Sequence, residues 1–205
     1  DADGRSLVFD YSEGWREPLR ATCVHELFHA VQFNYETDVQ AHGFFEASAV
    51  AMETRFVPES HDYMQYAREL VDLASMAPFP TGVVAQAYPQ GLQVRSMMSD
   101  LGIDVVKALW ESRKNNPPNP PSFLSTLRQV LPLFHGSFDT QLVRHAVRVA
   151  LTGRRSGWSL PDLALFPDAA SFPTLVRTLP RSAIPTELRL ELGGVQVLID
   201  TLVPA

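Results

Sequence analysis

The stretch Cys23-Val24-His25-Glu26-Leu27-Phe28-His29-Ala30-Val31-Gln32 determines how the rest of the chain is interpreted. Its centre has the pattern H-E-x-x-H, which places two histidines four positions apart. On a helix, side chains four positions apart share one face, with their Cβ atoms roughly 5–6 Å from each other. His25 and His29 can therefore bind the same metal ion, and Glu26 lies beside that ion as a candidate general base for hydrolysis.

The helix that carries this motif is expected at about residues 19–35 and has two different sides. At about 100° per residue, an apolar stripe gathers opposite the histidines, and it consists of Val24, Leu27, Phe28, Val31 and Tyr35. We expect this stripe to pack on the core. The histidine side would then be free to line a cleft.

A third ligand is needed, because a catalytic zinc ion usually has three protein ligands and a water. The candidate is Glu46, at the start of a second predicted helix that ends near Arg55. The small residues Ala47, Ser48 and Ala49 would let this helix approach the first one closely. Glu53 lies on the same face, about 10 Å further along the axis. It competes with Glu46 as a ligand, or acts as a partner of one.

At this point the sequence resembles the gluzincin metallopeptidases, the group that includes thermolysin and the aminopeptidase N family. A second helix of that group carries a glutamate ligand in an E-[GA]-x-A context, which Glu46-Ala47-Ser48-Ala49 matches. The extended motifs H-E-L-F-H-A-V-Q and F-F-E-A look closest to secreted bacterial metalloproteases of this kind. The segment Tyr88-Pro89-Gln90-Gly91 is similar to a Y-x-x-G segment of the aminopeptidase N family, whose tyrosine stabilises the oxyanion.

The resemblance implies that His25, His29 and Glu46 bind Zn²⁺, with Glu26 and Tyr88 as catalytic residues. Two features depart from the group. Val50 stands where the thermolysin type has an aspartate that orients a histidine, and no G-x-M-E-N segment occurs in residues 1–24. A histidine remains an alternative to Tyr88 as the oxyanion donor.

Composition limits the class of protein and its partners. The chain has 205 residues, 45% of them hydrophobic and 20% charged, as in soluble globular proteins. A net charge of −6 argues against a nucleic-acid partner. No apolar run is long enough for a membrane span, and the single Cys23 excludes an internal disulfide. We expect a secreted or extracellular bacterial protein, with a cytoplasmic location as the alternative; the oligomeric state stays open.

The predicted fold class is α+β and predominantly helical, with a gluzincin-like domain at residues 1–155. Only one strand of its N-terminal sheet, at residues 7–11, is expected in this chain. Residues 156–205 would form a linker and a β-hairpin that begins a C-terminal β-domain. The hairpin is predicted from strict alternation at 187–192, a Gly-Gly turn and a second strand at 195–199. Further helices are expected at residues 61–75, 89–101, 103–114, 122–131 and 137–152.

The predicted function is therefore zinc-dependent hydrolysis of a peptide or protein substrate. Two alternatives remain open at the level of sequence. One is a catalytically inactive gluzincin-like module that binds without hydrolysing, although the presence of Glu26 argues against it. The other is a metal-dependent hydrolase of a non-peptide substrate, because H-E-x-x-H specifies the metal and the base but not the substrate.

Overall fold

The structure is a computed structural model that describes residues 14–36, 42–64, 66, 87–114, 123–157 and 162–172. It also gives the backbone of two strands, β1 (Glu187–Leu192) and β2 (Val195–Asp200). The strand predicted at residues 7–11 and most of the helix predicted at 61–75 lie outside the described residues. The described part is predominantly helical, as predicted.

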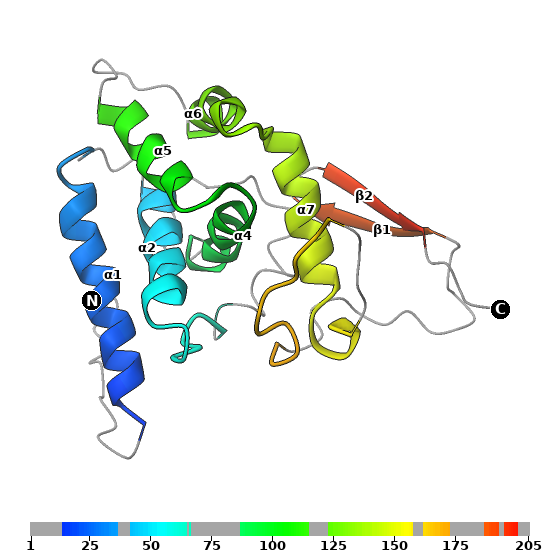
Figure 1. The fold of residues 1–205 in the computed structure, drawn as a ribbon, viewed down its shortest axis with the longest axis horizontal. Coiled ribbons are helices and arrows are strands. Elements are labelled where there is room, and N and C mark those ends of the chain that lie inside the picture. Colours follow the sequence, from blue (N-terminus) through cyan, green and yellow to red (C-terminus); the bar gives the residue numbers. More distant parts are fainter. Residues whose placement is uncertain are drawn as a thin grey trace.

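The helices follow the order expected from the sequence (Figure 1). Their bounds are α1 Arg16–Gln32, α2 His42–Phe56, η3 Tyr88–Gln90, α4 Gly91–Leu101, α5 Asp104–Lys114, α6 Phe123–Val130, η4 Leu131–Phe134, α7 Phe138–Ala150 and η5 Gly153–Arg155. The start of α2 differs from the prediction, because this helix begins four residues before Glu46. Glu46 therefore lies in the second turn of α2 rather than at its beginning.

Helix α2 forms the centre of the domain, between α1 on one side and α4 on the other (Figure 1). Its side chains Phe44, Ala47 and Met52 are buried in a core shared with α4, α5, α6 and α7. The start of α4 touches α2 because residue 91 is a glycine. A Cβ atom at Gly91 would lie 2.5 Å from Cγ1 of Val50. This close contact holds Tyr88, three residues earlier, near α2.

Helix α4 is in turn joined to α7 by buried charges. The fully buried Arg148 of α7 donates to the carboxylate of Asp100 and to Ser96, both on α4. Its Nε also donates to the carbonyl oxygen of Ala164 at 2.8 Å. A buried charge is tolerated only when it is paired and hydrogen-bonded. These contacts therefore hold the elements that carry Tyr88 in a fixed arrangement.

Strands β1 and β2 pair in antiparallel fashion as a hairpin. Their register matches Glu187 with Asp200 and Leu192 with Val195. At the level of the backbone this is the hairpin expected from the alternating sequence. The domain boundary at residue 155 and a larger β-domain stay predictions.

The orientation predicted for α1 is wrong in part. Its buried residues are Ala21, His25 and Gln32, so the histidine side packs in part against α2, although Glu26 on that side is exposed. Within the apolar stripe, Val24, Phe28 and Tyr35 pack against the core, but Leu27 is 68% exposed and Val31 46% exposed. The polar side can be buried because its polar atoms find hydrogen-bond partners on α2.

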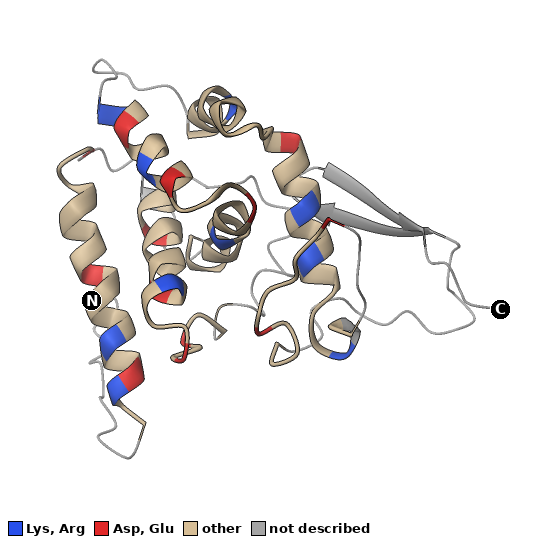
Figure 2. Ribbon diagram, in the orientation of Figure 1, with Lys and Arg blue, Asp and Glu red and all other residues tan. Residues whose placement is uncertain are grey.

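The outward side of α1 is apolar over much of its length. The charged residues of α1 lie in its first half, apart from Glu26 (Figure 2). The stripe, together with Phe56, Ile103 and Trp110, lines an apolar cavity of about 530 Å³. His25, His29 and Glu46 do not line this cavity. Within the described residues, no helix combines the length and the apolar character needed to cross a membrane.

Candidate metal centre

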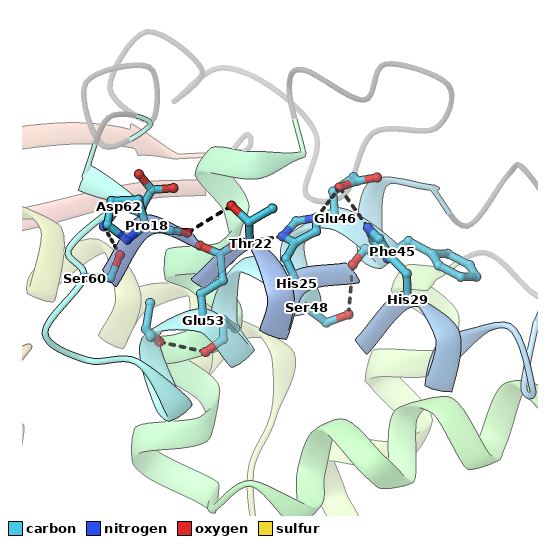
Figure 3. A network of polar contacts seen from close by, with 12 residues as sticks. Pro18, Thr22, His25, His29, Phe45, Glu46, Ser48, Glu53, Ser60 and Asp62 are labelled. Atoms are coloured by element: carbon cyan, nitrogen blue, oxygen red, sulfur yellow. Dashed lines mark hydrogen bonds and ion pairs between the residues drawn. The ribbon is translucent and has the colours of Figure 1, made fainter. Parts of the chain in front are cut away.

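The structure brings together the three residues that the sequence predicts as ligands. Nε2 of His25 lies 3.1 Å from Oε2 of Glu46, and Nε2 of His29 lies 3.4 Å from the same oxygen. The two imidazole rings are 4.6 Å apart, edge to face. Figure 3 shows both rings directed at the Glu46 carboxylate. One candidate ligand atom from each residue lies within 4.8 Å of the other two.

Two features of the helices produce this convergence. The four-residue spacing puts His25 and His29 on the side of α1 that faces α2. On α2, the small residues Ala47 and Ser48 are fully buried, so the two helix backbones can approach closely. Glu46 stands at the edge of this contact and remains partly accessible. The close helix packing expected from these small residues is therefore present.

The nitrogen of each ring that faces away from Glu46 also has a partner. Nδ1 of His25 lies 2.5 Å from Oε1 of Glu53, and Nδ1 of His29 lies 2.6 Å from Oε1 of Gln32. A carboxylate or an amide oxygen accepts hydrogen bonds, so each Nδ1 carries a hydrogen. Each Nε2 then carries a lone pair that faces another acceptor, the Glu46 carboxylate. This arrangement is unfavourable unless a cation lies between them. That cation is either a proton or a metal ion.

In the metal-free protein the cation is a proton, as the pKa values indicate. Burial alone would lower the pKa of His25, but hydrogen bonds to Glu46 and Glu53 outweigh it and raise the pKa to about 9. Burial opposes the shift at His29 as well, and hydrogen bonds to Glu46 and Gln32 still raise its pKa. Burial would raise the pKa of Glu46, but the two imidazoles lower it to about 2.

Glu53 occupies the position of a supporting carboxylate, not that of a third ligand. It touches the ring nitrogen of His25 that faces away from Glu46. Burial raises the pKa of Glu53, although the hydrogen bond with His25 acts in the opposite direction. Its second oxygen, Oε2, is buried with no hydrogen-bond partner in the described part of the chain. Of the two roles considered for Glu53, its position fits that of a partner to a ligand.

Of the two predicted catalytic residues, Glu26 is exposed and Tyr88 is half-buried. Glu26 follows His25 directly and is exposed. The ring of Tyr88 stacks on His25 with 5.9 Å between ring centroids, and Tyr66 stacks on Tyr88 at 4.9 Å. Burial raises the pKa of Tyr88, and the charges of Glu46 and Glu26 act in the same direction. The phenol therefore keeps its proton at neutral pH and can donate a hydrogen bond.

Three other histidines have described side chains. His145 is buried in α7, where burial and the charge of Arg148 lower its pKa to about 3, so it is a neutral core residue. His61 pairs with Asp168 at 3.5 Å, and His135 is exposed after η4. The side chain of His42 lies outside the described residues.

Sequence reasoning missed Gln32. A glutamine three positions after the second histidine carried no recognisable signal of a role at the site. The sequence had only one relevant indication, the small serine at position 48 on the predicted facing helix. In the structure Gln32 donates to Ser48 and accepts from His29.

Comparison of the chain with models of known protein families, with curated proteins and with solved structures finds no significant match. Support for a function therefore comes from the arrangement of the residues described above.

Proposed function

We propose that this chain is a zinc-dependent peptidase that hydrolyses peptide bonds in a peptide or protein substrate. The proposal includes His25, His29 and Glu46 as the zinc ligands, Glu26 as the general base and Tyr88 as the oxyanion donor. An extracellular location is part of the same proposal, because the motifs resemble those of secreted bacterial metalloproteases.

One observation carries the proposal: two imidazole Nε2 atoms and a carboxylate oxygen converge while both Nδ1 atoms are held by acceptors. Histidine ligands of metals almost always donate their other ring hydrogen to a carboxylate, a carbonyl or a water. Here one such partner is a carboxylate, Glu53, and the other is an amide oxygen, Gln32. A helix with two histidines on a solvated face would not require either buried partner.

The donor set fits zinc. Two imidazoles and one carboxylate are the ligands of several catalytic zinc sites, which keep one position open for water or substrate. Glu46 is partly accessible, and exposed Glu26 lies next to the cluster, so solvent can reach it. A closed structural site would not need an accessible acid–base residue beside it.

When bound at these three residues, a zinc ion supplies Lewis acidity that polarises the scissile carbonyl and acidifies water. The residues of this chain account for the remaining steps. Glu26 takes the proton from the attacking water and passes it to the leaving amine. Tyr88, held on His25 and protonated at neutral pH, donates to the oxygen that becomes negatively charged. Glu53 and Gln32 hold the two imidazoles in place.

The experiment that tests this proposal combines metal analysis with hydrolysis. The purified chain, supplied with Zn²⁺, should bind one zinc per chain and cleave members of a peptide library, and a chelator should abolish cleavage. Glu26→Gln keeps the shape of the side chain but removes the base, so zinc should stay bound while cleavage falls by about 10²-fold or more. Glu17→Gln, on the same helix but away from the histidines, is the matched control and should cleave like the parent.

Each possible failure has its own meaning. A chain that binds zinc without cleaving any peptide would refute the peptidase and support a binding module. Cleavage of ester or other non-peptide substrates alone would support the second alternative. Parental activity in Glu26→Gln would exclude Glu26 as the base.

A further inference from the structure

The side chain of Gln32, the last residue of α1, is fully buried and makes three polar contacts. Its Oε1 lies 2.6 Å from Nδ1 of His29. Its Nε2 lies 3.0 Å from the carbonyl oxygen of Phe45 and 2.8 Å from Oγ of Ser48. A buried amide with both ends hydrogen-bonded has little freedom to rotate, since any change would leave polar atoms unpaired.

The direction of every hydrogen bond in this chain of contacts follows from two backbone carbonyls. Oγ of Ser48 lies 2.6 Å from the carbonyl oxygen of Phe44, which can only accept, so the serine hydroxyl donates there. The lone pairs of Ser48 and the carbonyl of Phe45 then both face Gln32. The group that Gln32 presents to them must therefore be its NH₂, which leaves Oε1 facing His29.

These hydrogen-bond directions determine which ring nitrogen of His29 carries a hydrogen. Because the Gln32 oxygen can only accept, Nδ1 of His29 must carry a hydrogen. The nitrogen that remains for a metal ion is Nε2, which is the one directed at Glu46. The same amide reaches α2 at Phe45, one residue before Glu46. One side chain thus contacts both the histidine and the backbone next to the carboxylate.

We propose that Gln32 is a positioning residue that holds two of the three candidate ligands in register. It accepts from Nδ1 of His29, which keeps Nε2 as the ligand atom, and it donates to the Phe45 carbonyl, which holds Glu46 opposite that atom. This inference rests on the proposed function for its metal, but the hydrogen bond to His29 exists in the metal-free chain. The role of Gln32 can therefore be tested separately.

Three variants separate positioning from simple packing. Gln32→Leu removes both the oxygen and the NH₂ group of the amide and puts an apolar side chain of similar size in its place. Gln32→Glu keeps an acceptor for His29 and loses the donor. Gln141→Leu is the matched control, because it removes a buried amide from α7 whose oxygen has no hydrogen-bond partner in the described part of the chain.

Two readouts are needed. The first is the Nδ1–H resonance of His29 in a ¹⁵N–¹H correlation spectrum of the metal-free chain. This resonance is visible only if a hydrogen bond slows the exchange of the hydrogen with water. The second is the affinity for Zn²⁺, measured by competition with a chelator. We expect Gln32→Leu to lose the resonance and to bind Zn²⁺ roughly 10–100-fold more weakly, the usual effect of removing the partner of a ligating histidine. Gln32→Glu should keep the resonance, and Gln141→Leu should match the parent in both.

The proposal is overturned if Gln32→Leu keeps both the resonance and the parental affinity. It is also overturned if the affinity falls while the resonance is unchanged, since Gln32 would then act through packing alone. If Gln32→Leu does not fold, the test uses folded Gln32→Glu. Loss of the His29 resonance in that variant would also overturn the proposal. A parent chain that binds no Zn²⁺ would refute the proposed function, and the resonance would still decide whether Gln32 orients His29.

Discussion

The stability of the metal-free chain should fall as the pH rises from about 6.5 to about 9. His25 has a pKa of about 9 in the folded protein, against 6.5 for an unperturbed histidine. A group with a raised folded-state pKa stabilises the fold fully below its unfolded pKa, and this contribution is lost as the pH rises through the folded value. The difference of about 2.5 pKa units corresponds to roughly 3 kcal/mol.

The stability that this cluster contributes should also fall at acidic pH, where Glu46 becomes protonated. The pKa of Glu46 is lowered to about 2, so its contribution is present above the usual value of 4.5 and is lost as the pH falls towards 2. The shifts of His25 and Glu46 describe one shared interaction and are not added together. For this cluster, the metal-free chain should therefore be most stable between about pH 4.5 and 6.5.

Denaturant unfolding at a series of pH values, with chelator present, measures the effect directly. Glu46→Gln removes a hydrogen bond that raises the pKa of His25. This variant should therefore lose less stability between pH 6.5 and 9 than the parent chain. Glu59→Gln, which changes an exposed carboxylate paired with Arg20, should leave the loss unchanged. Adding Zn²⁺ should reverse the trend, because ligating imidazoles must give up their protons. A metal-free stability that is flat or rising over this range would refute the reasoning.

Two further substitutions test the surroundings of the cluster. Glu53→Gln keeps an acceptor beside His25 but removes the charge, so the affinity for Zn²⁺ should fall roughly 10–100-fold in chelator competition; parental affinity would mean that this carboxylate does not support the ligand. Gly91→Ala should lower the free energy of unfolding by about 1–3 kcal/mol, because the added Cβ would lie 2.5 Å from Val50. Combining it with Val50→Ala should recover part of this loss, and no recovery would place the strain elsewhere.

Much of the fold could be predicted from sequence because local signals and packing agree. Apolar periodicity indicated α5, and either Ser137 or Asp139 was expected to start the helix that is now α7. In the structure Ser137 caps it, because its Oγ accepts from the backbone N–H of Thr140 at 3.1 Å. The start of α2 could not be predicted in this way. The helix was expected to start at Glu46, but Gly43 and Phe44 are buried within it, where packing against the core outweighs the low helix propensity of glycine.

The clustering of His25, His29 and Glu46 could also be predicted from sequence, since the four-residue spacing brings the two histidines together and a helix of small residues follows with Glu46. Their role as metal ligands stays a prediction. The hydrogen-bond partners of the two Nδ1 atoms could not be predicted from sequence. Glu53 was recognisable only as a carboxylate on the same face as Glu46. Which atom of His25 it would contact depends on how the two helices pack. Contacts between side chains from different helices depend on this packing geometry, which no periodicity encodes.

The orientation of α1 follows from a competition that hydrophobicity alone does not describe. The apolar Leu27 is exposed, while the polar Gln32 and His25 are almost completely buried. Burying polar groups is costly unless each is hydrogen-bonded, and here the Nδ1 atoms of His25 and His29 and both ends of the Gln32 amide have partners. What remains is an excess of acceptors: two Nε2 lone pairs and the Glu46 carboxylate converge with no hydrogen of their own between them. In the metal-free chain protons fill this gap, which is why the pKa of His25 is raised to about 9. A divalent cation would satisfy all three atoms at once, which is the physical reason for expecting a metal there.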